Sequence, residues 1–511
     1  MGSRRSLSSI GIGTGLALLV VSVSTPAEAI PVFSRKYNTS CATCHVAYPK
    51  LNAFGKAFRN NGYRMPGGDE DYLKDENVKL GADPWRRLWP DAIWPSDIPY
   101  LPPVAFLIEN ETVYEPDSTI KTDFRTPSNV ALLTGGTLGG TLSWFGRVNL
   151  VAPGAPTHVH RLYAQLNGLF GSSLVNVRLG QMEPAAVPFS SNLRLTRTDY
   201  LMNTATFPLD SWVDYLSSLG DADEDENDDH GMGDHDDMSL LPPGLGGGHG
   251  HGGSFALSTP QQGLELYGAV SGFGGSGGFE YAVGVVNGNG SGNFGATGYN
   301  DNNSAKDVYW RASYKIGGMS VLGDPGSAPA VTNNWEDNSV RLGAFGYHGK
   351  APFLFGGADE GAGHDMDGMF RVASAEPDHD DDHGMVEDPA GMLVNENFTR
   401  IGGDIDIWWG RLNLYGAYMW GKTEMSPRLL HDAETDFKVW FAQADYVLYP
   451  WLIGSLRYER GYYPDPFRDI ERWVPSVTAL IRANVKATFD AALYNDLELG
   501  DSYRLTFDFA F

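Results

Sequence analysis

The sequence is poor in cysteine, in positive charge and in long apolar runs. Only 2 of its 511 residues are cysteine, and 37 Lys and Arg stand against 63 Asp and Glu. These figures disfavour a disulfide-stabilised scaffold and a basic protein that binds nucleic acid. After residue 30, no apolar stretch approaches the roughly 18 residues of a transmembrane helix, so a chain that spans a membrane must do so as a barrel. Glycine is abundant, with 63 residues, and aromatics make up 12%, a composition that favours many short strands.

The negative charge is concentrated in two segments. Residues 209–255 contain 12 acidic residues and no Lys or Arg, and residues 355–397 contain 12 acidic residues and one base, Arg371. The two segments therefore carry −12 and −11 of a formal net charge of −26. Acidic, Gly-rich stretches of this kind are typical of solvated loops, and the rest of the chain is close to charge balance.

Residues 1–29 have the pattern of a secretory signal peptide. Arg4 and Arg5 precede a short apolar run that is densest over residues 16–21, and residues 27–29 supply the small side chains of a cleavage site. We expect cleavage after Ala29, with an uncleaved anchor as the alternative. Either way, the chain is predicted to leave the cytoplasm.

Both cysteines lie in one motif, Cys41-Ala42-Thr43-Cys44-His45, which has the C-x-x-C-H spacing of a c-type haem attachment site. Two thiols at this spacing can reach the two vinyl groups of one porphyrin while the adjacent imidazole binds the iron from one face. We therefore predict one covalent haem c on Cys41 and Cys44, with His45 as an axial ligand. The alternative is a thioredoxin-like dithiol or half of a zinc site, which the export signal and the following His disfavour.

The second axial ligand is predicted from position along the chain. No His occurs between His45 and His158, and the first Met after the motif is Met65. A thioether opposite an imidazole raises the potential of haem iron and favours electron transfer over oxygen chemistry. Met65 is therefore the predicted ligand. The alternative is that Met65 is an ordinary linker residue and that water or another group holds the position.

Residues on both sides of the motif follow a specific order. Residues 31–35 (PVFSR) precede it, and residues 49–58 (PKLNAFGKAF) and Gly62-Tyr63 follow it. This order, over about 35 residues, resembles the N-terminal segment of the outer-membrane cytochrome–porin fusion family, whose known members are iron oxidases. The resemblance implies a monohaem c-type segment fused to a porin-like barrel.

The end of the chain has the pattern of an outer-membrane strand. In the last ten residues, apolar side chains from Tyr503 to Phe511 alternate strictly with the side chains of Arg504, Thr506, Asp508 and Ala510. An apolar-out, polar-in strand that ends in Phe is typical of bacterial outer-membrane barrels. A strand of a soluble sandwich has the same period, so that alternative stays open.

Sixteen segments with such alternation, separated by turn residues, can be distinguished, with an uncertainty of two because residues 183–260 have room for an extra pair. The predicted fold is therefore all-β. It is a transmembrane antiparallel β-barrel of about 16 strands over residues 104–511, preceded by a small, mainly helical or irregular haem c segment and a Trp- and Pro-rich connector over residues 30–103. The predicted strands begin near Val104, Asn129, Gly140, His158, Leu174, Gln262, Gly278, Ala305, Asn338, Phe398, Trp409, Thr435, Trp451, Trp473, Val485 and Ser502.

Loop lengths agree with this fold. If the N-terminus lies in the periplasm, connections after odd-numbered strands face outward and should be long, and those after even-numbered strands should be short turns. Both acidic segments follow odd-numbered strands, the fifth and the ninth, whereas residues 316–334 form a long connection after an even-numbered strand. Charges are expected in the lumen at Arg457, Glu459 and Arg504. The aromatic residues expected in the interfacial girdles are Trp408, Trp409, Tyr449 and Trp451.

The two acidic segments also contain His and Met. Carboxylates and imidazoles are ligands that first-row divalent metals accept, and 24 acidic residues would concentrate cations at the outer mouth. Flexible loops would bind metal loosely and exchange it fast; the alternative is that they are solvated loops with no metal role. The candidate residues are His230, His235, His249, His251, His364, His379 and His383.

Two functions from different classes agree with these features. The first is an electron conduit or oxidase, in which single electrons pass from an extracellular donor, predicted to be Fe(II), through one haem c to a periplasmic c-type cytochrome or another carrier. Such a protein would be an Fe(II):cytochrome c oxidoreductase with no catalytic residue beyond the haem. The second is a porin for solute or metal uptake whose haem-bearing segment is a plug or sensor. Both predict contact with the lipid of a bacterial outer membrane, with the N-terminal segment in the periplasm or the lumen.

Overall fold

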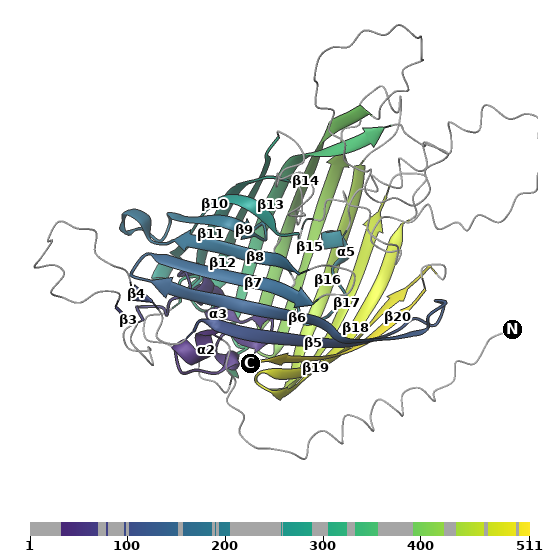
Figure 1. Cartoon of the computed structure of the whole chain (residues 1–511), viewed down its shortest axis with the longest axis horizontal. Coiled ribbons are helices and arrows are strands. Elements are labelled where there is room, and N and C mark those ends of the chain that lie inside the picture. Colours follow the sequence, from purple (N-terminus) through teal and green to yellow (C-terminus); the bar gives the residue numbers. More distant parts are fainter. Residues whose placement is uncertain are drawn as a thin grey trace, which may run out of the picture.

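The computed structural model places most of the described chain in a closed antiparallel β-barrel, drawn in Figure 1. Each barrel strand pairs with two neighbours, and the last strand, β20 (Ser502–Ala510), closes the ring against the first, β5 (Val104–Tyr114). The structure describes residues 32–69, 78–79, 97–98, 102–151, 157–186, 190, 194–204, 257, 259–288, 305–323, 333–355, 392–423, 436–463, 469–496 and 500–511.

The barrel has sixteen strands within these residues, which confirms the predicted fold class and strand number. Two strands begin earlier than predicted, β6 at Thr122 and β14 at Met392, because their first residues extend the backbone pairing beyond the alternation that marked them. Between β5 and β20 the strands are β6 (Thr122–Leu138), β7 (Leu142–Val151), β8 (His158–Leu166), β9 (Asn176–Met182), β10 (Gln261–Ser271), β11 (Gly278–Val286), β12 (Asp307–Gly317), β13 (Ser339–Phe355), β14 (Met392–Trp409), β15 (Leu412–Thr423), β16 (Asp436–Tyr449), β17 (Leu452–Tyr462), β18 (Ile470–Arg482) and β19 (Val485–Tyr494).

Side chains of the wall alternate between the lumen and the outer surface. Outward-facing Leu179 and Leu342 are 60% and 51% exposed, whereas the inward-facing charged residues Arg457 and Glu459 are fully buried. An apolar outer surface around a polar interior is the reverse of a soluble fold and is what a barrel in lipid requires. The predicted lumen charges and outer-membrane location are therefore confirmed, and the sandwich alternative is excluded.

Short turns join strands at one end of the barrel, over residues 139–141, 410–411, 450–451 and 483–484. In outer-membrane barrels this is the periplasmic end. The acidic connections that follow β9 and β13 leave from the opposite end, as predicted. One long connection joins β12 to β13, and its described parts, residues 318–323 and 333–338, lie at the periplasmic end.

The aromatic girdle at the turn end is only partly as predicted. Trp409, Tyr449 and Trp451 are 76%, 57% and 50% exposed on the outer surface. The prediction was wrong for Trp408, which is buried in the lumen and packs against Val46. The physical reason is the two-residue period of a strand, which sends only one of two adjacent Trp side chains outward.

The N-terminal residues 32–69, which we call the plug, lie in the lumen at the periplasmic end. In Figure 1 their purple helices lie at the end of the barrel where the C-terminus is marked. Within the described residues, no helix has the length and apolar character needed to cross a membrane. The plug consists of α2 (Val32–Lys36), η2 (Cys41–Thr43), β1 (His45–Ala47), β2 (Lys50–Leu51) and α3 (Ala53–Asn60), and a separate two-stranded pair is formed by β3 (Val78–Lys79) and β4 (Asp97–Ile98).

A second segment, residues 194–204 with α5 (Leu201–Thr204), also folds into the lumen. The guanidinium of Arg457 donates to the hydroxyl of Thr196 at 2.9 Å and to the carbonyl of Thr198 at 2.8 Å. Leu195 packs in one cluster with Val46 of the plug. The described residues between β9 and β10 thus form a helical inner segment, and none of them forms an additional strand pair.

Candidate functional site

The two thiols of the C-x-x-C-H motif are held on a 3₁₀ turn at the centre of the plug. The side chain of Ser40 accepts a hydrogen bond from the amide of Ala42 at 3.2 Å and so caps η2. Cys41 and Cys44 form no disulfide. Both line one cavity together with His45 and Met65, which we call the motif cavity.

Helix α3 fixes the geometry of this turn. Its N-cap residue Asn52 accepts from the amide of Gly55 at 2.8 Å and donates to the carbonyl of Thr43 at 3.1 Å. The amide of Asn52 donates to the carbonyl of Cys44 at 3.0 Å. A Cβ at Gly55 would lie 2.1 Å from that carbonyl oxygen, so the close approach of α3 to the motif requires glycine here.

His45 is oriented by a hydrogen bond from its ring. Nδ1 lies 3.1 Å from the carbonyl oxygen of Pro49 and therefore carries the proton, because a carbonyl can only accept. Burial lowers the pKa of His45 to about 4, so the imidazole is neutral. Nε2 is left with its lone pair, which is the arrangement that metal-ligating histidines have.

The thiols are in their protonated form. Burial raises the pKa of Cys44 to about 12 and also raises the pKa of Cys41. A reactive dithiol needs thiolates with a lowered pKa, so the raised pKa values disfavour that alternative. Within the described residues, no group of three or more His, Cys, Asp or Glu side chains is placed to hold a metal ion.

The motif cavity has the lining that a porphyrin needs. The plug contributes aromatic walls, with Phe33 stacked on Tyr63 at 5.1 Å and Phe58 edge-on to Phe33 at 5.2 Å. Apolar cover of this kind excludes water from a haem and holds its potential. The residue set therefore fits a haem c: two thiols, an oriented imidazole and a thioether around an apolar space. Barrel residues that complete the wall include Leu107, Leu133, Phe145, Tyr163, Leu480 and Val485.

Met65 reaches the same cavity by way of a tight turn after α3. Gly62 and Tyr63 both have positive φ angles, of 66° and 62°, and a Cβ at Gly62 would lie 2.3 Å from the side chain of Asn167. The turn reverses the chain, and Met65, 5% exposed, lines the cavity that His45 also lines. Met65 remains the predicted second ligand.

We expect Met65→Leu to keep the covalent haem while abolishing its low-spin spectrum and lowering its potential, because Leu preserves the volume but has no donor atom. Visible spectroscopy and a redox titration measure both effects. Met182→Leu is the matched control, since Met182 is buried in the same cluster but does not line the cavity. If Met65→Leu leaves the spectrum and potential unchanged, another group is the ligand.

The long periplasmic connection between β12 and β13 holds the motif from the barrel side. The side-chain amide of Asn334 donates to the carbonyl of Ala42 at 2.9 Å and to the carbonyl of His45 at 2.6 Å. Asn61 of the plug donates to the carbonyl of Leu322 at 2.6 Å. This contact with the plug accounts for a connection whose length departs from the loop-length rule.

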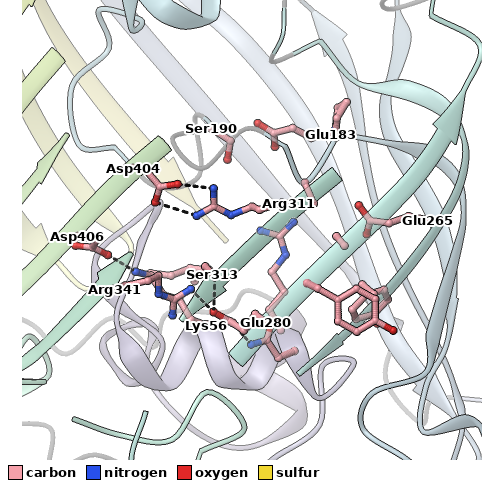
Figure 2. A pocket seen from close by; sticks show the side chains of 18 of the residues that line it. Lys56, Glu183, Ser190, Glu265, Glu280, Arg311, Ser313, Arg341, Asp404 and Asp406 are labelled. Carbon is pink, nitrogen blue, oxygen red and sulfur yellow. Dashed lines mark hydrogen bonds and ion pairs between the residues drawn. The ribbon is translucent and has the colours of Figure 1, made fainter. Parts of the chain in front are cut away.

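A second cavity adjoins the plug on the lumen side, and its walls are charged (Figure 2). We call it the charged chamber. Arg311 makes two hydrogen bonds to Asp404, at 2.6 and 2.9 Å, and Lys56 of α3 contacts Asp406 at 2.9 Å. The chamber is also lined by the ion pairs Arg341–Glu280 and Arg178–Glu265, and by Lys50, which pairs with Asp445.

Some predicted site residues cannot be placed. His230, His235, His249, His251, His364, His379 and His383 lie outside the described residues. The structure brings Cys41, Cys44, His45 and Met65 together, and it adds cavity residues that sequence reasoning missed. Among these are Arg59, Arg147, Arg161 and Lys486. Arg59 could have been predicted as a site residue from the sequence, because it lies three residues after Lys56 on α3. The other three residues come from the barrel wall, and only the barrel topology brings them to the cavity.

No protein-family model matches the chain, and a search of curated proteins gives no match. Solved structures with a similar fold are outer-membrane barrels. A Salmonella typhi OmpF complex with daunomycin has a TM-score of 0.43 and 11% identity over 80% of this chain and 97% of that one. An OmpT loop-deletion mutant of Vibrio cholerae has a TM-score of 0.41 and 8% identity, over 80% of this chain and 98% of that one. The channel DcaP of Acinetobacter baumannii has a TM-score of 0.38 and 9% identity, over 80% of this chain and 96% of that one. The barrel is established by the strand pairing of the chain itself, and these likenesses carry no functional argument.

Proposed function

We propose that this protein is an outer-membrane electron conduit of the cytochrome–porin fusion type. Cys41, Cys44, His45 and Met65 would hold one haem c, which would carry single electrons from an extracellular donor, Fe(II), to a periplasmic c-type cytochrome. The observation that carries the proposal is that two thiols, an imidazole and a thioether line one apolar cavity at the periplasmic end of the lumen.

A haem held by these residues would supply the one-electron redox chemistry that links oxidation of the donor Fe(II) to Fe(III) with reduction of the periplasmic cytochrome. The chain supplies position and environment. The hydrogen bond from His45 to the Pro49 carbonyl orients the imidazole, and Asn52 and Asn334 hold the backbone of the motif. Aromatic plug residues exclude water.

Two segments occupy part of the lumen, which supports this proposal. The plug is bound to the wall through ion pairs of Lys50 with Asp445 and of Lys56 with Asp406, and the inner segment 194–204 packs beside it. A fixed plug and an inner segment obstruct diffusion of a solute. The second candidate, a porin with a haem-bearing plug, is favoured by the barrel fold and by the charged chamber in its lumen.

Liposomes that enclose oxidised cytochrome c and carry the purified protein test the proposal. External Fe(II) is expected to reduce the enclosed cytochrome, whereas liposomes with the Cys41→Ala/Cys44→Ala protein should not support reduction. No reduction by a protein whose haem content is complete would refute the electron conduit. High single-channel conductance of the same protein would support the porin.

The acidic segments offer a second test of the donor. We expect that deleting residues 221–251 and 359–388 together leaves haem content and potential unchanged but slows reduction by Fe(II). The reason is that their charge attracts cations to the outer mouth, so the effect should be largest at low ionic strength. Stopped-flow reduction at several salt concentrations measures it. Full-rate reduction at low salt would show that these segments have no role in donor capture.

A further inference from the structure

The motif cavity is lined by four cations, and carboxylates of the barrel pair with three of them. Arg147 lies 3.3 Å from Glu109, Arg161 lies 2.8 Å from Glu183, and Lys486 lies 3.1 Å from Asp508. The fourth cation is Arg59. Its guanidinium makes no hydrogen bond or ion pair with any residue that the structure describes, which distinguishes it from the other three.

Arg59 also lines the charged chamber, so its side chain lies at the boundary between the two cavities. It occupies the last turn of α3, three residues after Lys56, whose ammonium faces Asp406 in the chamber (Figure 2). Each of the other five cations of the chamber is paired with a carboxylate, as described above. Of the cations that line the two cavities in the described part of the chain, Arg59 alone has no carboxylate in contact with it; Glu183, which pairs with Arg161, acts on Arg59 only from a longer distance.

The Arg59 guanidinium faces both cavities with no anion in contact with it, so its donors are available to an anion that enters either cavity. A guanidinium is also the side chain whose planar donors match a carboxylate in two parallel hydrogen bonds. A carboxylate bound in the motif cavity could therefore pair with Arg59 in this way. A haem carries two propionate carboxylates into the cavity that Arg59 lines.

We propose that Arg59 is the anion-binding residue of the motif cavity and that its ligand is a propionate of the haem, an inference that rests on the proposed function. Arg59 compensates the propionate charge and holds the carboxylate end of the haem at the boundary with the charged chamber. It is a positioning residue, because it acts on the cofactor and not on the reacting iron.

The test compares full-length Arg59→Gln and Arg59→Lys proteins, after covalent haem has been quantified in each. In Arg59→Gln the resonance Raman band of the propionate groups should shift. At a fixed ambient redox potential, the ratio of reduced to oxidised haem should fall roughly tenfold, because the propionate charge is no longer compensated and favours the ferric state. Arg59→Lys should restore most of that ratio. Lys56→Gln, which removes a cation from the same helix on the chamber side only, should leave the propionate band unmoved.

Three results would overturn the inference. The first is that the Arg59→Gln protein has its full haem content but shows no shift of the propionate band and no change in potential. This would show that Arg59 does not contact the propionate. An effect that appears only when citrate is added would assign Arg59 to a free carboxylate in the chamber. Wild-type protein without covalent haem would refute the proposed function itself, and the separate haem measurement distinguishes this failure from the first two.

Discussion

Replacing Cys41 and Cys44 together with Ala is expected to remove covalent haem completely. In the proposed attachment, each thiol forms one thioether bond to a vinyl group, so the double variant would have no covalent attachment. Haem that stays with the polypeptide after denaturation and gel electrophoresis measures the effect directly. Each single variant keeps one thiol and is expected to retain part of that haem.

The barrel of the double variant should be unaffected, because neither thiol contributes to strand pairing. A heat-dependent shift in gel mobility, as outer-membrane barrels show, is the control for folding. Covalent haem retained at the wild-type level in the double variant would contradict the assignment of the motif.

Replacing Lys50 with Met is expected to loosen the attachment of the plug to the wall. Lys50 is 4% exposed, and its ammonium pairs with Asp445 and donates to the side-chain carbonyl of Asn413 at 2.6 Å. It also lies 4.6 Å from the ring of Tyr415. Removing one partner of a buried ion pair leaves an uncompensated charge and costs about 3–5 kcal/mol.

Hydrogen exchange of the plug amides measures this cost as a local opening free energy. The expected increase in exchange rate is on the order of a thousandfold, which corresponds to about 4 kcal/mol. Channel conductance is expected to rise at the same time, since the plug obstructs the lumen. Lys50→Met/Asp445→Asn is the matched control and should recover most of the protection, because neither charge remains buried alone. Equal protection in the single variant and the wild type would show that this pair does not hold the plug.

The sequence by itself determined the features that depend on local spacing. The C-x-x-C-H motif is readable because haem attachment needs both thiols and the imidazole within five residues. The sixteen strands are readable because each wall strand alternates between lipid and lumen, and the terminal strand from Ser502 to Ala510 pairs as its alternation predicts. The side on which the long acidic connections lie follows from strand parity alone.

Only the tertiary structure decided which distant residues meet in the lumen. Lys50 and Asp445 are 395 positions apart, and Asn334 reaches the carbonyl of His45 from 289 positions away. No local period encodes such pairs, because barrel closure and shear decide which inward side chains lie opposite the plug. The lumen position of Trp408 and the lack of a contacting carboxylate at Arg59 were likewise decided only by the tertiary structure. Each depends on which side chains lie on the opposite side of the lumen, and the closed barrel decides this, not the neighbouring sequence.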